Sequence, residues 1–171
     1  MAGTLASALL TQRGASRVKE RELEHADRQR LDDRIHAQQA RRHQERCDSY
    51  AEFITLTGTL HSQIYELRSP SQGDDSYRVA YEQARSDRAA LLRQAHRILL
   101  EGPKTVSDEA LELYGAMNLW MSVANDVYKA EAAGNSSQVD AKRRRFLEIR
   151  DRCKRSRSAF VREAQKVINQ A

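Results

Sequence analysis

The sequence predicts an all-α protein: an up-down antiparallel four-helix bundle with a long protruding N-terminal helix. Only 7 glycines and 2 prolines occur in 171 residues, and 31% of the residues are charged while 6% are aromatic. This composition is typical of long helices, since sheets need more frequent turns. Pro70 and Pro103 both lie between stretches of periodic apolar residues, where helices have to end. A chain of this length favours a single domain.

The first predicted helix covers Thr4 to Leu67, which contains no proline and is rich in Arg, Glu, Gln, Ala and Leu. A kink at Gly14 is an alternative to one straight helix. At about 1.5 Å per residue this helix would be on the order of 95 Å long, longer than a small domain. Part of it should therefore extend beyond the bundle.

The apolar pattern indicates which part extends. From Cys47 onward apolar residues recur at helical spacing, at Tyr50, Ile54, Leu60, Ile64 and Leu67. Before Cys47 they are sparse and lie among charged residues. We expect residues 1–30 to form a protruding helical stalk and residues 31–171 to form the bundle, as one domain continuous with the stalk.

Three further helices complete the prediction. They cover Tyr77 to Glu101, Val106 to Ala132, and the chain from Ser137 to the C-terminus. Each has an apolar face. In the helix over 77–101 this face is Tyr81, Ala84, Leu91, Ala95 and Ile98, and in the helix over 106–132 it is Leu113, Met117, Trp120, Ala124 and Val127. In the helix that starts at Ser137 it is Val139, Phe146, Ile149, Cys153, Phe160, Ala164 and Val167. The third helix of the chain has a second apolar stripe, Leu111, Tyr114, Met121 and Tyr128, and should be the central one.

Capping signals and short connections set the expected ends and register. Thr105 with Asp108 resembles a capping box, and Ser137 is a candidate N-cap. If residues 67 and 137 lie at the same end of an up-down bundle, Cys47 and Cys153 should lie within about one turn in height.

The net charge of +5 is concentrated in the last predicted helix, because residues 137–171 hold 11 Lys and Arg against 4 Asp and Glu. At 100° per residue, one strip of that helix contains Arg143, Arg150, Lys154 and Arg157. Such a strip could bind the phosphates of nucleic acid or an anionic membrane. The competing interpretation is that these side chains pair with acidic residues of the two preceding helices, such as Glu112, Asp126 and Glu131.

No motif indicates an enzyme, a cofactor, a metal site or a small-molecule substrate. The chain lacks a Gly-rich phosphate loop, a Cys-x-x-Cys pair and a nucleophile elbow. His43 and Cys47 have metal-ligand spacing, but burial of Cys47 and Cys153 as core thiols is the favoured interpretation. Glu22 and His25 form a single Glu-x-x-His motif, whereas a di-iron bundle needs two.

The stalk has three interpretations. It could be a solvated helix held by ion pairs, a self-association arm, or a helix lying on lipid through Leu5, Leu9 and Leu10. We favour self-association through Leu5, Leu9, Ala15 and Val18, because a long exposed helix gains stability by pairing as a coiled coil. The expected partner is a second copy of the chain or another helical protein. With 2 cysteines and no signal peptide pattern, the predicted location is cytoplasmic, with peripheral membrane attachment as the alternative.

The stretch from Leu9 to Arg17, Leu-Leu-Thr-Gln-Arg-Gly-Ala-Ser-Arg, resembles uncharacterised actinobacterial helical proteins with a long charged N-terminal helix. The Tyr50-x-x-Phe53 pattern in the following bundle helix also fits them, and 23 Arg against 6 Lys fits a GC-rich genome. The resemblance covers the first third of the chain and implies no known activity. Such proteins often carry a membrane span ahead of the matching segment, and we expect none here because Leu9 is so near the first residue.

Our leading hypothesis from sequence is a non-enzymatic helical interaction or scaffold protein that self-associates through its long N-terminal helix. The alternative is a nucleic-acid or anionic-membrane binding module that uses the basic C-terminal helix.

Overall fold

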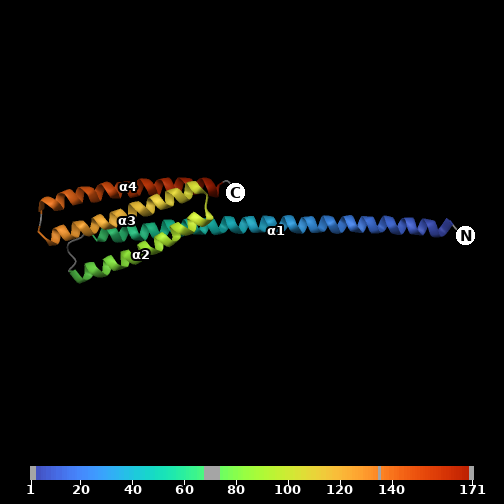
Figure 1. Cartoon of the computed structure of the whole chain (residues 1–171), viewed down its shortest axis with the longest axis horizontal. Coiled ribbons are helices and arrows are strands. Elements are labelled where there is room, and N and C mark those ends of the chain that lie inside the picture. Colours follow the sequence, from blue (N-terminus) through green and yellow to red (C-terminus); the bar gives the residue numbers. More distant parts are fainter. Residues whose placement is uncertain (1–2, 68–73, 135, 170–171) are drawn as a thin grey trace. The chain divides into compact units, whose positions relative to one another are not determined.

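The computed structural model describes the backbone of residues 3–67, 74–134 and 136–169, and the side chains of these residues from 25 onward except that of Asp74. Within this part of the chain all regular structure is helical. The helices are α1 (Gly3–Glu66), α2 (Asp74–Glu101), α3 (Lys104–Ala132) and α4 (Ser136–Ile168) (Figure 1). The all-α prediction is confirmed, and α1 is helical through Gly14.

Contacts between residues divide the chain into two units, Met1–His43 and Gln44–Ala171. In the first unit the side chains of residues 25–42 are exposed, apart from that of Ala26, which is half-buried. The buried side chains that the structure describes all belong to the second unit. The boundary that we predicted after residue 30 stays a prediction.

The core of the second unit is centred on α3. The first predicted stripe of α3 is fully buried, and in the second stripe Met121 is buried while Leu111, Tyr114 and Tyr128 are partly buried. Large side chains from α1 and α4 pack around it, namely Tyr50, Phe53, Leu60, Ile64, Phe146, Ile149 and Phe160. Because burial of each such side chain stabilises the fold by about 1.5–3 kcal/mol, this cluster supplies most of the driving force for folding.

Contacts between the helices of the second unit are those of a bundle (Figure 1). The Gln94 amide of α2 is buried and donates to the Ser49 carbonyl of α1 at 2.9 Å and to the Ser49 hydroxyl at 3.0 Å. Arg88 of α2 donates to the Asn118 side chain of α3 at 2.7 Å. Phe160 of α4 packs against Tyr50 and Phe53 of α1. The buried Gln94 amide is satisfied across two helices, as buried polar groups usually are.

The capping box predicted from Thr105 and Asp108 is wrong. Helix α3 begins at Lys104, and its N-cap is Pro103, whose φ of −62° and ψ of 149° are extended and which has no side-chain cap. Thr105 therefore lies inside the first turn, beyond the capping position. Ser107 instead links α3 to α2, since its hydroxyl donates to the Ile98 carbonyl of α2 at 3.1 Å.

At the other end of α3 the chain turns through a glycine. Ala133 is the C-cap, and Gly134 has a φ of 67°, the left-handed conformation that favours glycine after a helix. Helix α4 begins at Ser136, so Ser137 lies within its first turn and the predicted N-cap is displaced. Helix ends are the least certain part of a pattern-based prediction.

The predicted register of the two cysteines is also wrong. Cys153 lines a cavity together with Thr57 and His61 of α1, so it is level with residues 57–61. Those residues lie ten or more positions beyond Cys47, which corresponds to an offset of roughly 15 Å or more along the helix. The two cysteines form no disulfide with each other.

Candidate functional site

The predicted anion-binding strip of α4 separates into two halves. Arg143 donates to Glu131 of α3 at 2.8 Å, and Arg150 pairs with the neighbouring Asp151 at 2.9 Å. Just outside the strip, Arg152 makes a cross-helix pair with Glu112 at 2.7 Å. The pairs of Arg143 and Arg152 follow the competing interpretation, in which basic residues of α4 are matched by acidic residues of α3, whereas the Arg150–Asp151 pair lies within α4.

The other half of the strip, Lys154 and Arg157, is different. Both side chains are exposed, and neither forms an ion pair with any residue that the structure describes. They line a cavity of about 490 Å³ between α1, α3 and α4. The sequence pattern placed these two residues on one strip with Arg143 and Arg150, whereas the structure gives them a separate environment.

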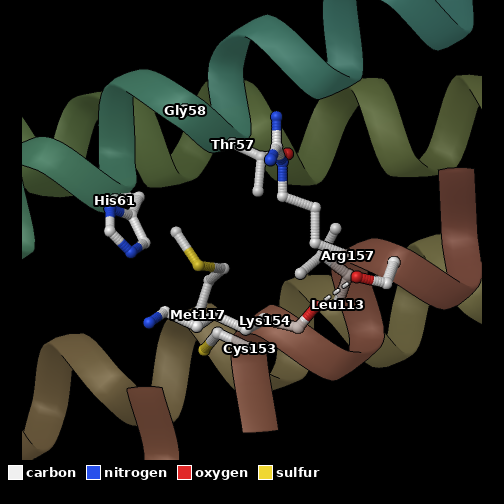
Figure 2. Close-up of a pocket in the computed structure, with 9 residues that line it drawn as sticks. Thr57, Gly58, His61, Leu113, Met117, Cys153, Lys154 and Arg157 are labelled. Carbon is white, nitrogen blue, oxygen red and sulfur yellow. Dashed lines mark hydrogen bonds between the residues drawn. The ribbon is translucent and has the colours of Figure 1, made fainter. Parts of the chain in front are cut away.

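We call this site the basic-rimmed cavity. Its lining residues are Thr57, Gly58 and His61 from α1, Leu113 and Met117 from α3, and Cys153, Lys154, Arg157 and Ser158 from α4. Figure 2 shows Arg157 reaching from α4 toward α1, with the Met117 thioether between the Arg157 side chain and the His61 ring. Its lining contains no acidic residue from the part of the chain that the structure describes.

Three helices position these groups. Helix α3 contributes the apolar wall, since Leu113 and Met117 belong to its fully buried stripe. Gly58 leaves space on the α1 side, because a Cβ built there has no heavy atom within 4 Å. Cys153 is buried, and burial raises the pKa of its thiol to about 12, so the group is a neutral, apolar part of the wall at neutral pH.

His61 connects the cavity to the core. Its ring packs on the indole of Trp120, with centroids 4.8 Å apart. The pKa of His61 lies below its usual range, first because burial disfavours the charged ring and then because Lys154, Arg157 and Arg150 repel a further positive charge. The cavity is thus an electropositive site with a neutral imidazole at neutral pH.

The other predicted site residues fall elsewhere. The backbone of Leu5, Leu9, Ala15 and Val18 is part of α1, but their side chains lie outside the described residues. In the same unit Leu31 and Ile35 are 58% and 43% exposed. His43 and Cys47 belong to no cluster of three or more metal-binding side chains within the described part of the chain.

Sequence reasoning missed Thr57, Gly58 and His61 as a site. The available signal was Gly58 itself, since a glycine in a helix interior costs about 0.5–1 kcal/mol relative to alanine and so suggests a local purpose. His61 follows three residues later on the same face. The sequence pattern did not give the register between α1 and α4, which places Lys154 and Arg157 opposite Thr57, Gly58 and His61.

Comparisons with protein families, with curated proteins and with solved structures find no match to this chain. The resemblance to actinobacterial helical proteins therefore stays a prediction. Over the residues described, none of the helices has an apolar stretch long enough to cross a bilayer.

Proposed function

We propose that this protein is a non-enzymatic interaction protein that self-associates through the N-terminal part of α1. The observation that carries the proposal is the exposure of Leu31 and Ile35, at 58% and 43%, four residues apart on one helix. Residues at this spacing share a helix face, as the contact residues of a coiled coil do. The proposal includes an up-down antiparallel topology for the bundle and a stalk that extends beyond it.

The charge of this segment supports a second copy as the partner. Residues 1–46 contain 10 Lys and Arg and 7 Asp and Glu, so the two signs are interspersed and nearly balanced. An antiparallel or staggered pair of identical helices can match such charges with one another, whereas a strongly acidic or basic partner would be matched only in part.

The first test is the solution mass by light scattering at low and high salt, for the full chain and for a chain lacking residues 1–43, the whole first unit. We expect an oligomer for the full chain and a monomer for the truncated one. If both the full chain and the truncated chain are monomeric, the proposal is contradicted.

A sharper test uses two double variants of the full chain. Leu31→Glu with Ile35→Glu places two charges on the proposed face and should lower the mass to that of a monomer. Gln29→Glu with Ala37→Glu adds the same charges to the opposite, exposed face and should leave the mass unchanged. Equal effects of the two variants would indicate a general charge effect and would contradict pairing through Leu31 and Ile35.

Binding of α4 to nucleic acid or an anionic membrane remains the second candidate. Arg144 and Arg155 favour it, since they are exposed and have no ion pair with the residues that the structure describes, as holds for Lys154 and Arg157. Affinity for anionic vesicles or duplex DNA that falls steeply with salt and is lost in Arg144→Gln with Arg155→Gln would support this candidate. If the double variant keeps its affinity for vesicles and DNA, this use of α4 is excluded.

A further inference from the structure

The rim of the basic-rimmed cavity carries positive charge that nothing in the described chain neutralises. Basic residues elsewhere on α4, such as Arg143 and Arg152, meet acidic partners on α3 at 2.8 Å and 2.7 Å. At the cavity, Lys154 and Arg157 have no such partner, and the lining contains no carboxylate among the described residues. Two like charges beside one cavity repel each other, so an anion between them would be stabilised.

The inner wall of the cavity is apolar. Leu113, Met117 and Cys153 are each at most 2% exposed overall, and each lines the cavity. On the α1 side the missing side chain of Gly58 keeps the space open. The volume of about 490 Å³ lies within the roughly 300–1,000 Å³ typical of small-molecule sites.

The remaining polar groups of the lining narrow the ligand further. The Thr57 hydroxyl donates to the Phe53 carbonyl. The Ser158 hydroxyl donates to the Lys154 carbonyl at 3.0 Å (Figure 2), so both hydroxyl protons are already used. The charged donors of the lining are the Lys154 ammonium and the Arg157 guanidinium, and neither is used in an ion pair with a described residue. A neutral polyol would need more donors and acceptors than this, whereas one carboxylate is matched by a guanidinium fork.

From the uncompensated cations at the rim and the apolar wall behind them, we infer that the basic-rimmed cavity binds a small amphipathic monoanion: a carboxylate on an apolar body. The carboxylate lies at Arg157 and Lys154, and the body lies against Leu113 and Met117. This inference is independent of self-association, because the lining residues named above all belong to the unit Gln44–Ala171, whereas self-association is proposed through the N-terminal part of α1.

Isothermal titration of the full chain with octanoate tests the inference, with 1-octanol and acetate as the two halves of the ligand. We expect one saturable octanoate site per chain and binding at least about tenfold weaker for either half, because a charged hydrogen bond and the apolar contact are each lost. Equal binding of octanol and octanoate, or no saturable octanoate binding in the millimolar range, would overturn it.

Matched variants locate the site. Arg157→Gln should weaken octanoate binding about tenfold, while Arg155→Gln, which removes the same charge from an exposed residue that does not line the cavity, should leave it unchanged. Equal loss in both would show general attraction to α4 and would overturn the inference.

A second pair tests the volume of the cavity. Gly58→Leu should fill it and abolish binding, while Gly115→Leu, at another helical glycine with open space around a Cβ, should not. Unchanged binding in Gly58→Leu would place octanoate elsewhere and would also overturn the inference. Circular dichroism of both variants checks that the helices remain, and the exposed Arg157→Gln substitution keeps the inference testable if Gly58→Leu does not fold.

Discussion

At the scale of single residues, Gly102 shows how little space a helix junction leaves. Its amide donates to the Ile98 carbonyl at 2.8 Å, and a Cβ at this position would lie 2.8 Å from the same oxygen and 3.1 Å from the Tyr50 hydroxyl. The Ile98 oxygen belongs to the backbone and also accepts from Ser107, so it cannot move without disturbing the start of α3.

Gly102→Ala should therefore lower the free energy of unfolding by about 1–3 kcal/mol, the usual cost of overpacking. Gly115→Ala is the matched control, because a Cβ there has no neighbour within 4 Å and alanine favours a helix interior; it should raise stability by about 0.5–1 kcal/mol. Urea unfolding followed by circular dichroism measures both. If Gly102→Ala leaves the free energy of unfolding unchanged, the junction between α2 and α3 can relax to accept the methyl group.

His61 should make stability depend on pH. Three cations of α4, Lys154, Arg157 and Arg150, act on it, and on the α3 side it packs on Trp120, which does not titrate. Its pKa is lower in the folded protein than in the unfolded chain, so the unfolded chain binds the proton first as pH falls. The His61 contribution to stability is therefore full above about pH 6.5 and is lost as pH falls from there through the lower, folded pKa.

His61→Gln should make the decrease in unfolding free energy between neutral and mildly acidic pH shallower. His96→Gln, which changes an exposed histidine, should leave the slope as it is. Urea unfolding across this pH range gives both slopes, and equal slopes for His61→Gln and the unchanged protein would contradict the assignment.

At the scale of elements, an aromatic cluster packs α4 against α1. The ring of Phe160 lies 4.8 Å from that of Phe53 and 6.1 Å from that of Tyr50, the latter edge-on at 86°, an arrangement that aromatic pairs prefer. Phe160 is fully buried, whereas Leu147 on the same helix is 38% exposed.

Phe160→Ala should cost about 3–5 kcal/mol of unfolding free energy, because it removes a buried ring and leaves a cavity. Leu147→Ala should cost under about 1 kcal/mol, since its side chain already contacts water. Denaturant unfolding of the two variants compares them directly. Similar losses would mean that the contact with Phe53 and Tyr50 does not set the stability of α4.

Pattern reasoning predicted the elements better than their alignment. The stripe of α3 from Leu113 to Val127 is buried as predicted, because helical periodicity encodes which face is apolar. The register between α1 and α4 was wrong because these helices are joined only through α2 and α3, so errors at each junction add. Packing of Phe160 on Tyr50 and Phe53 fixes the alignment, and a count of residues contains no information about that fit.

The basic-rimmed cavity could not be predicted from the sequence for the same reason. Lys154 and Arg157 were identified as part of a basic strip, but their role depends on what lies opposite. His61 and Gly58 lie 93 to 99 residues earlier in the chain than Lys154 and Arg157, and only the correct register brings the four residues together. A site formed across helices needs the packing and cannot be found from one helix alone.

At the scale of the whole molecule, the two units should differ in local stability. Side chains of residues 25–42 bury almost nothing within the described chain, whereas α3 supplies the centre of the core. A helix without tertiary packing opens easily, while amides in a packed core exchange only on global unfolding.

Hydrogen exchange should therefore be far faster for amides of residues 25–42 than for those of α3. If α1 pairs with a second copy, exchange in residues 25–42 should slow as protein concentration rises, while exchange in α3 should not change. Uniform protection at all concentrations would contradict the division into a packed unit and an unpacked helix.

Trp120 is the only tryptophan of the chain and is fully buried, and its indole N–H has no hydrogen-bond partner among the described residues. Its ring packs against those of His61, with centroids 4.8 Å apart, and Phe146, with centroids 5.2 Å apart. Its fluorescence should therefore be blue-shifted, and protonation of the adjoining imidazole should quench it. Trp120 is thus an intrinsic fluorescence probe that needs no added dye. Its emission wavelength reports the integrity of the core, and its emission intensity reports the protonation of His61 at the cavity.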